Sequence, residues 1–355
     1  MIHMPVSETA QRRVRNEAPP ARGSRRRQSF GLLRSWDTAI VVALVIAVVV
    51  ASLAVKGFAS PRNTGFLLID IIPVLLLSLP MALIILIGEI DLSVASIAGF
   101  TSCIFGALWN AGMPMETIVP VCILLGAVWG ALNGFLVSVV GLPSLAVTIG
   151  SLALYRGLAF VTLGDQAVTS FPLNVTSGLQ AKLGNSGIPV WIIPVLVLVV
   201  IFGFVLHFTG FGRTLFALGF SEDAARFAGI RVAQTRFWLF VVSGVISAVV
   251  GVWWTLRYGS ARGDNATGLE LSVIAAVLLG GVSIFGGKGN LPGVIAGVAL
   301  LAILRNALQL ASVPEDTLSM LTGGLLIVAV VAPNAIMWSR NRGHRTKILS
   351  IPLTK

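Results

Sequence analysis

The chain has 355 residues, of which 56% are hydrophobic and 11% are charged, and its mean hydropathy is +0.93. This composition excludes an ordinary soluble domain, which needs more polar surface to cover its core, and indicates a protein that uses lipid as part of its solvent. The net charge of +11 sits in the two tails, with eight arginines in residues 1–36 and five lysines or arginines in residues 339–355, so membrane topology explains it better than a nucleic-acid surface.

Long apolar runs without strand-like alternation predict membrane helices rather than a barrel. A helix needs about 20 apolar residues to cross the bilayer core. Runs of this kind fall at 38–55, 66–87, 92–110, 117–139, 143–163, 189–208, 237–257, 270–286, 291–311 and 317–338. We therefore expect an all-α integral membrane protein with about ten spans in a transmembrane domain over residues 37–338. A basic N-terminal arm (1–36) and a basic tail (339–355) flank this domain.

The distribution of basic residues predicts the orientation of these spans. Both basic tails are expected in the cytoplasm, which requires an even number of crossings. With ten spans, the inner loops and tails hold 18 lysines and arginines and the outer loops hold five. The basic 209–236 loop then faces inward and the 164–188 loop faces outward. The prediction is a multi-pass protein of the bacterial inner membrane with both termini cytoplasmic.

The two halves, about 37–163 and 189–338, resemble each other weakly. Asp91-Leu-Ser-Val opens the third span and Glu270-Leu-Ser-Val opens the eighth, and Ile-Phe-Gly follows at 104–106 and at 284–286. Glycines at four-residue spacing follow in the next span of each half. Five spans per half is an odd number, so equivalent helices would run in opposite directions, as in the inverted repeats of transporters. Chance matching of apolar sequence is the alternative.

A few polar residues in or beside the apolar runs are candidates for the solute pathway or for breaks in the helices. Asp91 and Glu270 each precede a Leu-Ser pair, where a carboxylate can cap a helix N-terminus and face its positive dipole end. A capping role and a role in the substrate path both remain open. The full candidate set is Asp91, Ser93, Asn133, Glu270, Ser272 and Asn306.

Nothing in the sequence predicts catalysis or a metal site. The Gly-Gly-Lys-Gly stretch at 286–289 lacks the glycine spacing and the hydroxyl residue of a phosphate-binding loop. The three histidines are scattered, and Cys103 and Cys122 lie inside apolar runs, where packing is their expected role. An enzyme is therefore not expected.

The 209–236 loop is the most informative polar segment. Ser221 can cap a short helix with Glu222 and Asp223 in its first turn, and Gly229 can end it. A short amphipathic helix at the cytoplasmic face would offer a docking surface to a soluble partner, although a solvated loop has the same composition.

At this loop the chain resembles the permeases of bacterial ABC importers for ribose, xylose, rhamnose and the autoinducer-2 signal, within the branched-chain-type permease superfamily. The segment 88–94 is similar to that family's Gly-Gly-Ile-Asp-Leu-Ser-Val signature, with Glu89 in place of the usual glycine, and the blocks 141–150 and 279–287 also match. The resemblance implies that the loop contacts an ATPase through Gly212, Arg213, Ser221, Glu222, Asp223, Ala224, Ala225, Arg226, Gly229 and Ile230.

The resemblance also implies the partners. A cytoplasmic ABC ATPase would bind ATP and magnesium, a periplasmic sugar-binding protein would deliver the solute, and a second permease, identical or related, would complete the pathway. This chain itself would bind no cofactor. The segments 257–264 and 312–314 favour rhamnose or a related deoxy-sugar as the substrate, with autoinducer 2 next. An ion-coupled secondary transporter of a small polar solute and a non-transporting scaffold or receptor are the alternatives.

Overall fold

The computed structural model describes residues 36–179, 181–184, 187–329 and 331, and all of its regular elements in these ranges are helices. The helices are α1 (Trp36–Ala54), α2 (Pro61–Leu86), α3 (Val94–Asn110), α4 (Met115–Ser138), α5 (Ser144–Leu163), α6 (Leu173–Gly178), α7 (Ile192–Phe208), α8 (Gly210–Phe220), α9 (Glu222–Phe227), α10 (Val232–Tyr258), α11 (Leu269–Leu279) and α12 (Leu291–Leu310). A further helix covers 315–329. The basic arm and tail lie outside the described residues.

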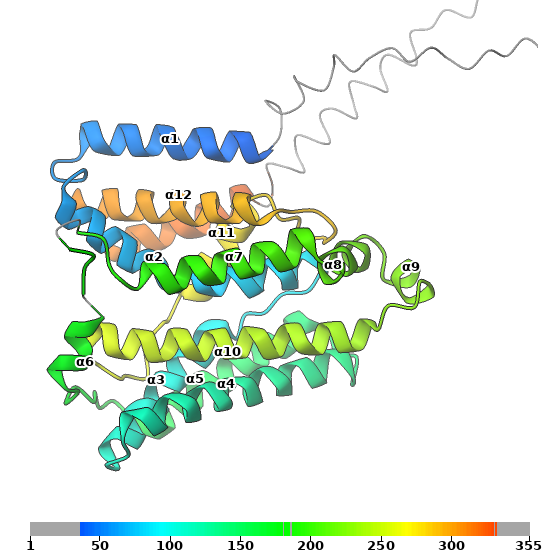
Figure 1. Cartoon of the computed structure of the whole chain (residues 1–355), viewed down its shortest axis with the longest axis horizontal. Helices are drawn as coiled ribbons and strands as arrows, with labels where there is room; N and C mark the ends of the chain where they lie inside the picture. Colours follow the sequence, from blue (N-terminus) through cyan, green and yellow to red (C-terminus); the bar gives the residue numbers. More distant parts are fainter. Residues whose placement is uncertain (1–35, 180, 185–186, 330, 332–355) are drawn as a thin grey trace, which may run out of the picture.

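The longer helices run side by side, with α8 and α9 at one end of the molecule and α6 at the other (Figure 1). Five helices, α2, α4, α5, α10 and α12, are long and apolar enough to cross a membrane within the described residues, and the bent pair α7–α8 gives a sixth. Helix α8 is bent away from α7 by 67°. All-helical membrane architecture is therefore confirmed, and every predicted apolar run coincides with at least part of a helix.

The prediction of a complete span over 270–286 is wrong, because α11 ends at Leu279 after 11 residues. Such a helix is about 16 Å long, roughly half of the hydrocarbon core. Glycine ends it: a Cβ at Gly280 would lie 2.5 Å from the Cα of Val294, and Gly281 has a φ of 90°. The chain then loops back, and the N–H of Gly287 donates to the carbonyl of Leu86 over 2.8 Å.

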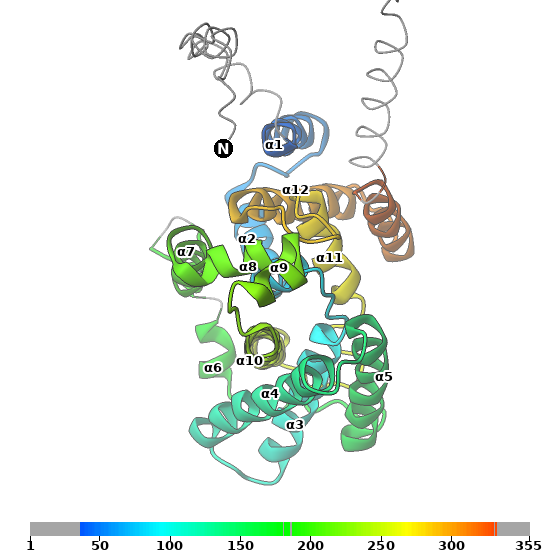
Figure 2. The same cartoon turned by 90° about the vertical axis from the view of Figure 1, so that its right-hand side faces the viewer.

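The helices form two packing groups, and each group contains helices from both halves of the sequence (Figure 2). In the α12 group, α2 and α7 pack with α11 and α12, and α1 lies on α12. In the α4 group, α10 packs on α3 and α4, and α5 covers α3. The second helix of each predicted half therefore lies with the third and fourth helices of the other half. The two groups meet chiefly where α2 contacts α10.

The glycines of α4 permit the closest helix contact in the α4 group. A Cβ on Gly130 would lie 2.4 Å from the carbonyl oxygen of Phe240, and one on Gly244 would lie 2.2 Å from that of Gly126. Because these neighbours are backbone atoms, only glycine allows α4 and α10 to approach so closely. The glycines of α4 therefore serve the close packing of α4 on α10. A Cβ on Gly297 of α12 would instead meet α11, 2.4 Å from the carbonyl oxygen of Ala276.

Candidate functional site

The polar 209–236 segment folds as two short helices and the start of α10. The Thr209 hydroxyl accepts a hydrogen bond from the N–H of Gly212 at the start of α8, and the Ser221 hydroxyl accepts one from the N–H of Ala224 at the start of α9, both over 3.3 Å. Glu222 and Asp223 occupy the first turn of α9, where their charge suits the helix dipole. Gly229 follows the helix with a φ of 82°. The expected capped helix is confirmed.

Glycines let α8 lie tightly against the ends of other helices. A Cβ on Gly212 would lie 1.9 Å from the carbonyl oxygen of Leu206, and one on Gly219 would lie 1.9 Å from that of Leu86 and 2.5 Å from the backbone nitrogen of Gly287. The C-terminal end of α8 is therefore wedged between the end of α2 and the loop after α11. This fixes the point from which α9 projects.

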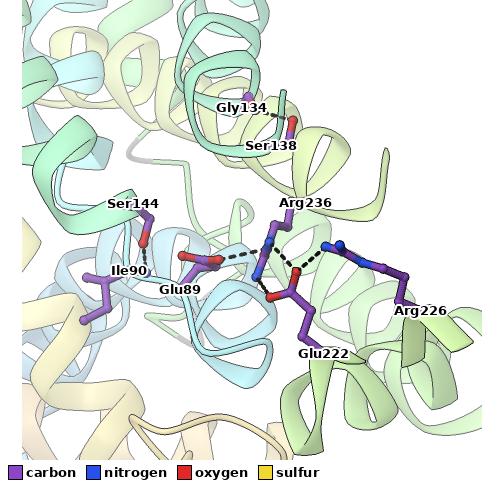
Figure 3. Close-up of polar contacts among 8 residues, drawn as sticks. All are labelled: Glu89, Ile90, Gly134, Ser138, Ser144, Glu222, Arg226 and Arg236. Carbon is purple, nitrogen blue, oxygen red and sulfur yellow. Dashed lines mark hydrogen bonds and ion pairs between the residues drawn. The ribbon is translucent and has the colours of Figure 1, made fainter. Parts of the chain in front are cut away.

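One arginine joins α9 to the loop between α2 and α3 (Figure 3). The guanidinium of Arg236 donates to both carboxylate oxygens of Glu222, over 2.7 and 3.2 Å, and its Nε lies 2.8 Å from Glu89 Oε1. Arg226 makes a second ion pair with Glu222 over 2.8 Å. The hydrogen bond from Arg236 holds the pKa of Glu222 below its ordinary value, and the charges of Arg236 and Arg226 add to this effect.

Sequence reasoning placed Arg236 in a loop and left the added charge of Glu89 without a partner. The structure begins α10 at Val232, so Arg236 lies inside the helix and faces both carboxylates. The side chains of Arg236 and Glu89 are only 19% and 14% exposed. No local sequence signal identifies this pairing, because the three residues come from separate segments.

Large aromatic side chains are exposed at the same end of the molecule. Phe227, the last residue of α9, is 92% exposed, and Phe220, the last of α8, is 83% exposed. Phe285, in the loop after α11, is also exposed. These three residues, which we call the aromatic surface, stand beside the charged side chains of α9. Exposed aromatics of this kind, next to charge, are typical of contact surfaces for other proteins.

The candidate Asp91 is buried and fully bonded within the α4 group. Its Oδ1 accepts from the backbone N–H and the hydroxyl of Ser93, over 3.0 and 2.6 Å, and its Oδ2 accepts from the hydroxyl of Ser243, over 2.7 Å. Ser93 is the residue just before α3, so Asp91 organises the turn that starts this helix. Ser243 lies on α10, 152 residues away in the chain. Helix α3 has Ser93 at its N-cap and no side-chain cap hydrogen bond in its first turn, so Asp91 closes the turn just before the helix and does not cap the helix itself.

Asn133 extends this buried cluster to α5. Its amide donates to the Ser93 hydroxyl over 2.8 Å, and its carbonyl oxygen accepts from the hydroxyls of Ser151 and Tyr155, over 2.5 and 3.2 Å. The cluster joins α3, α4, α5 and α10 through satisfied hydrogen bonds. Sequence reasoning missed Ser151, Tyr155 and Ser243, which come from helices whose packing it could not place.

The remaining candidates lie elsewhere. Asn306 exchanges amide hydrogen bonds with Asn63, over 2.8 and 3.1 Å, and so links α12 to α2. Glu270 and Ser272 are in the first turn of α11, after a Gly268 cap with a φ of 82°. The candidate set is therefore spread over three places, and its members do not surround one common cavity.

Near the α6 end of the molecule, two backbone hydrogen bonds join the segment after α5 to the segment after α10. The N–H and C=O of Val168 pair with those of Ala261, over 3.0 and 2.9 Å. Arg156 of α5 adds side-chain hydrogen bonds to the carbonyl oxygens of Gly263 and Asn265, over 2.9 and 2.8 Å. Both contacts tie the α4 group to the chain that leads into α11.

Comparison with known proteins identifies one family. Residues 63–330 match the family described as branched-chain amino acid transport system / permease component. The autoinducer 2 import system permease protein LsrD of Photorhabdus laumondii subsp. laumondii is 33% identical over 314 residues, which cover 85% of this chain and 92% of that protein. LsrD of Yersinia enterocolitica is 32% identical over 302 residues, covering 83% and 91%.

A solved structure described as an inward-facing conformation of a metal-chelate type ABC transporter aligns with a TM-score of 0.49. The identity is 16%, and the alignment covers 84% of this chain and 98% of that chain.

Proposed function

This chain belongs to the branched-chain amino acid transport system permease family, and we propose that it is the permease subunit of an ABC importer for a small polyhydroxylated solute. The observation that carries the proposal is α9, a capped helix held at one end of the helical domain by ion pairs and ending in the exposed Phe227. A transporter that is driven by a separate ATPase subunit needs such a surface, because the ATPase must bind the membrane subunit outside the bilayer.

The assembly follows from this assignment. A cytoplasmic ATPase carries ATP and magnesium and contacts α8, α9 and the aromatic surface. A periplasmic binding protein delivers solute at the opposite end, where α6 lies, and a second permease, identical or related, completes the pathway. ATP hydrolysis belongs to the partner, and this chain supplies the path and the mechanical connection to it.

We place ten crossings in the inner membrane with both termini in the cytoplasm, arranged as two inverted halves. The eighth crossing in this proposal is made by the short α11 together with the non-helical chain on either side of it. The exchange of α2 and α10 between the packing groups supports inverted halves, since each occupies the corresponding place in the other half's group. Two such groups can tilt about their contact and open the path alternately to each side.

Autoinducer 2 replaces rhamnose as the first substrate to test. The relatives reported above are named for autoinducer 2, at 32–33% identity over more than four-fifths of this chain. The proposal of rhamnose as the substrate rests only on the resemblance of two short segments, 257–264 and 312–314. Both molecules are small and rich in hydroxyl groups, so the proposed class of solute is the same whichever of the two is tested first.

An ion-coupled transporter is not favoured by these observations. Such a protein needs a coupling-ion site near the middle of the membrane. Both carboxylate oxygens of Asp91 are occupied by hydrogen bonds from Ser93 and Ser243.

The test is reconstitution with a candidate ABC ATPase and a candidate sugar-binding protein from the same organism, whose genes we expect beside this one. Purified chain, ATPase and any second permease are placed in vesicles with ATP inside and binding protein outside, and uptake of labelled autoinducer 2 and rhamnose is measured. We expect uptake that requires ATP, the ATPase and the binding protein. Uptake that persists without ATP and follows an imposed proton or sodium gradient would instead establish the secondary transporter.

A further inference from the structure

The chain passes between the two packing groups at both ends of the molecule. At the inner end, segment 87–93 connects α2 to α3, and segment 221–231, which contains α9, connects α8 to α10. At the outer end, the segments after α5 and after α10 make the return connections. Any tilting of one group against the other must therefore be accommodated by these four connections.

The two ends hold their connections together in different ways. The outer pair is joined by backbone hydrogen bonds between Val168 and Ala261. The inner pair is joined by charged side chains: Glu89 in one connection and Glu222 in the other share Arg236 of α10 (Figure 3). Two carboxylates repel each other, so the arginine between them is what keeps these segments together. Because Arg236 contacts Glu89 and Glu222 through side chains alone, this contact can transmit movement while the backbones of the two segments shift.

Glu89 stands at the start of a segment that reaches several helices. The next residue, Ile90, donates its N–H to the Ser144 hydroxyl at the first residue of α5 over 3.2 Å, and its carbonyl accepts from Thr148 over 3.3 Å. Asp91 then positions Ser93 before α3. A displacement at Glu89 therefore reaches the inner ends of α3 and α5 within four residues.

We infer that Glu89 is a positioning residue for transport: through Arg236 it passes displacement of α9 to segment 87–93 and so to the inner ends of α3 and α5. The inference rests on the proposed function, because the partner ATPase supplies the displacement. Two properties indicate that this ion-pair network transmits displacement and is not simply an exposed surface ion pair. Both Glu89 and Arg236 are largely buried, and the guanidinium contacts the two carboxylates through different nitrogen atoms.

The experiment measures solute imported per ATP hydrolysed in the reconstituted vesicles, together with the amount of ATPase that co-purifies with the chain. Glu89→Gln keeps the shape and removes the charge. We expect normal ATPase retention and continued ATP hydrolysis, with solute per ATP falling at least fivefold. Glu89→Asp keeps the charge and should stay within twofold of the wild type. Glu315→Gln, which makes the same change in a glutamate paired with Arg305 at the other end, is the matched control and should leave the ratio unchanged.

Three results separate the possibilities. A Glu89→Gln ratio within twofold of the wild type overturns the inference, and so does loss of the ATPase or of folded protein, which would make Glu89 an anchor only. Equal losses in Glu89→Gln and Glu89→Asp also overturn it, because the charge would then be irrelevant. A wild-type chain that fails to retain the ATPase or to import with ATP refutes the proposed function instead.

Discussion

Among single residues, Phe227 has the clearest expected effect on partner binding. Its side chain is 92% exposed, so it contributes little to the fold of this chain, yet an aromatic anchor buried at an interface often dominates binding. We expect Phe227→Ala to weaken the affinity for the ATPase about tenfold, or about 1.4 kcal/mol. Titration of purified ATPase onto the immobilised, detergent-solubilised permease measures this. Phe204→Ala, on the exposed face of α7, is the control, and unchanged affinity in Phe227→Ala would mean that this ring faces lipid.

The pKa of Glu222 predicts how α9 responds to acid. Because Arg236 lowers the pKa of Glu222 below 4.5, the folded state holds the ionised carboxylate more tightly than the unfolded state does. The stabilisation is complete above the unfolded pKa and is lost as the pH falls through the lower, folded pKa. We expect a spin label at Ala228→Cys to become more mobile as the pH falls below about 4.5. In Glu222→Gln the label should be mobile already at pH 7, and a label as immobile there as in the wild type would contradict the proposed attachment.

Local and distant contacts at the site differ in how far sequence could predict them. The Ser221 cap and the Asp91–Ser93 turn join residues within three positions of each other, so the order of residue types was sufficient. The pairing of Glu89 with Arg236 and of Asp91 with Ser243 depends on how α10 packs between α3, α4 and α2. Apolar periodicity locates α10 in the chain, but it does not say which helices surround it.

At the scale of helices, the contact between α4 and α10 predicts an asymmetric response to adding one methyl group. Gly130→Ala would place a Cβ 2.4 Å from a backbone oxygen of α10, whereas Gly150→Ala on α5 meets nothing within 4 Å. Overpacking of this kind costs roughly 1–3 kcal/mol. We expect Gly130→Ala to lower the thermal unfolding midpoint in detergent and Gly150→Ala to leave it unchanged or slightly raised. Equal midpoints for both variants would show that α4 and α10 separate without cost.

Helix α11 shows why composition alone overestimated one span. Residues 270–286 are apolar enough for a full crossing, but the helix ends at Gly280, where α12 comes too close for any side chain, and Gly281 then turns the chain with a φ of 90°. Whether a glycine lies within a helix or ends it depends on the neighbouring backbone, which the sequence does not reveal.

For the whole molecule, the exchange of α2 and α10 makes the two packing groups depend on each other. Neither half of the sequence forms a packing group alone, since α2 packs with the third and fourth helices of the second half and α10 packs with those of the first half. The inner connections carry the charged link and the aromatic surface, and the outer connections carry the backbone pairing of Val168 with Ala261. An ATPase that acts on the inner connections would therefore tilt the two packing groups about the outer end, where backbone pairing holds the connections together.

This mechanism requires the α9 end to face the cytoplasm, which chemical labelling can test. The native cysteines Cys103 and Cys122 are buried and can be replaced by serine, after which single cysteines are introduced at Asp223 and at Lys182, both exposed and at opposite ends. Because 18 of the 25 lysines and arginines fall on the α9 side in the ten-span arrangement, we expect Asp223→Cys to react with a membrane-impermeant thiol reagent only in inside-out vesicles. Lys182→Cys should react in intact spheroplasts. Reaction of Asp223→Cys in spheroplasts would place α9 in the periplasm, where no ATP-driven partner could reach it, and the role of Glu89 would then have no source of movement to transmit.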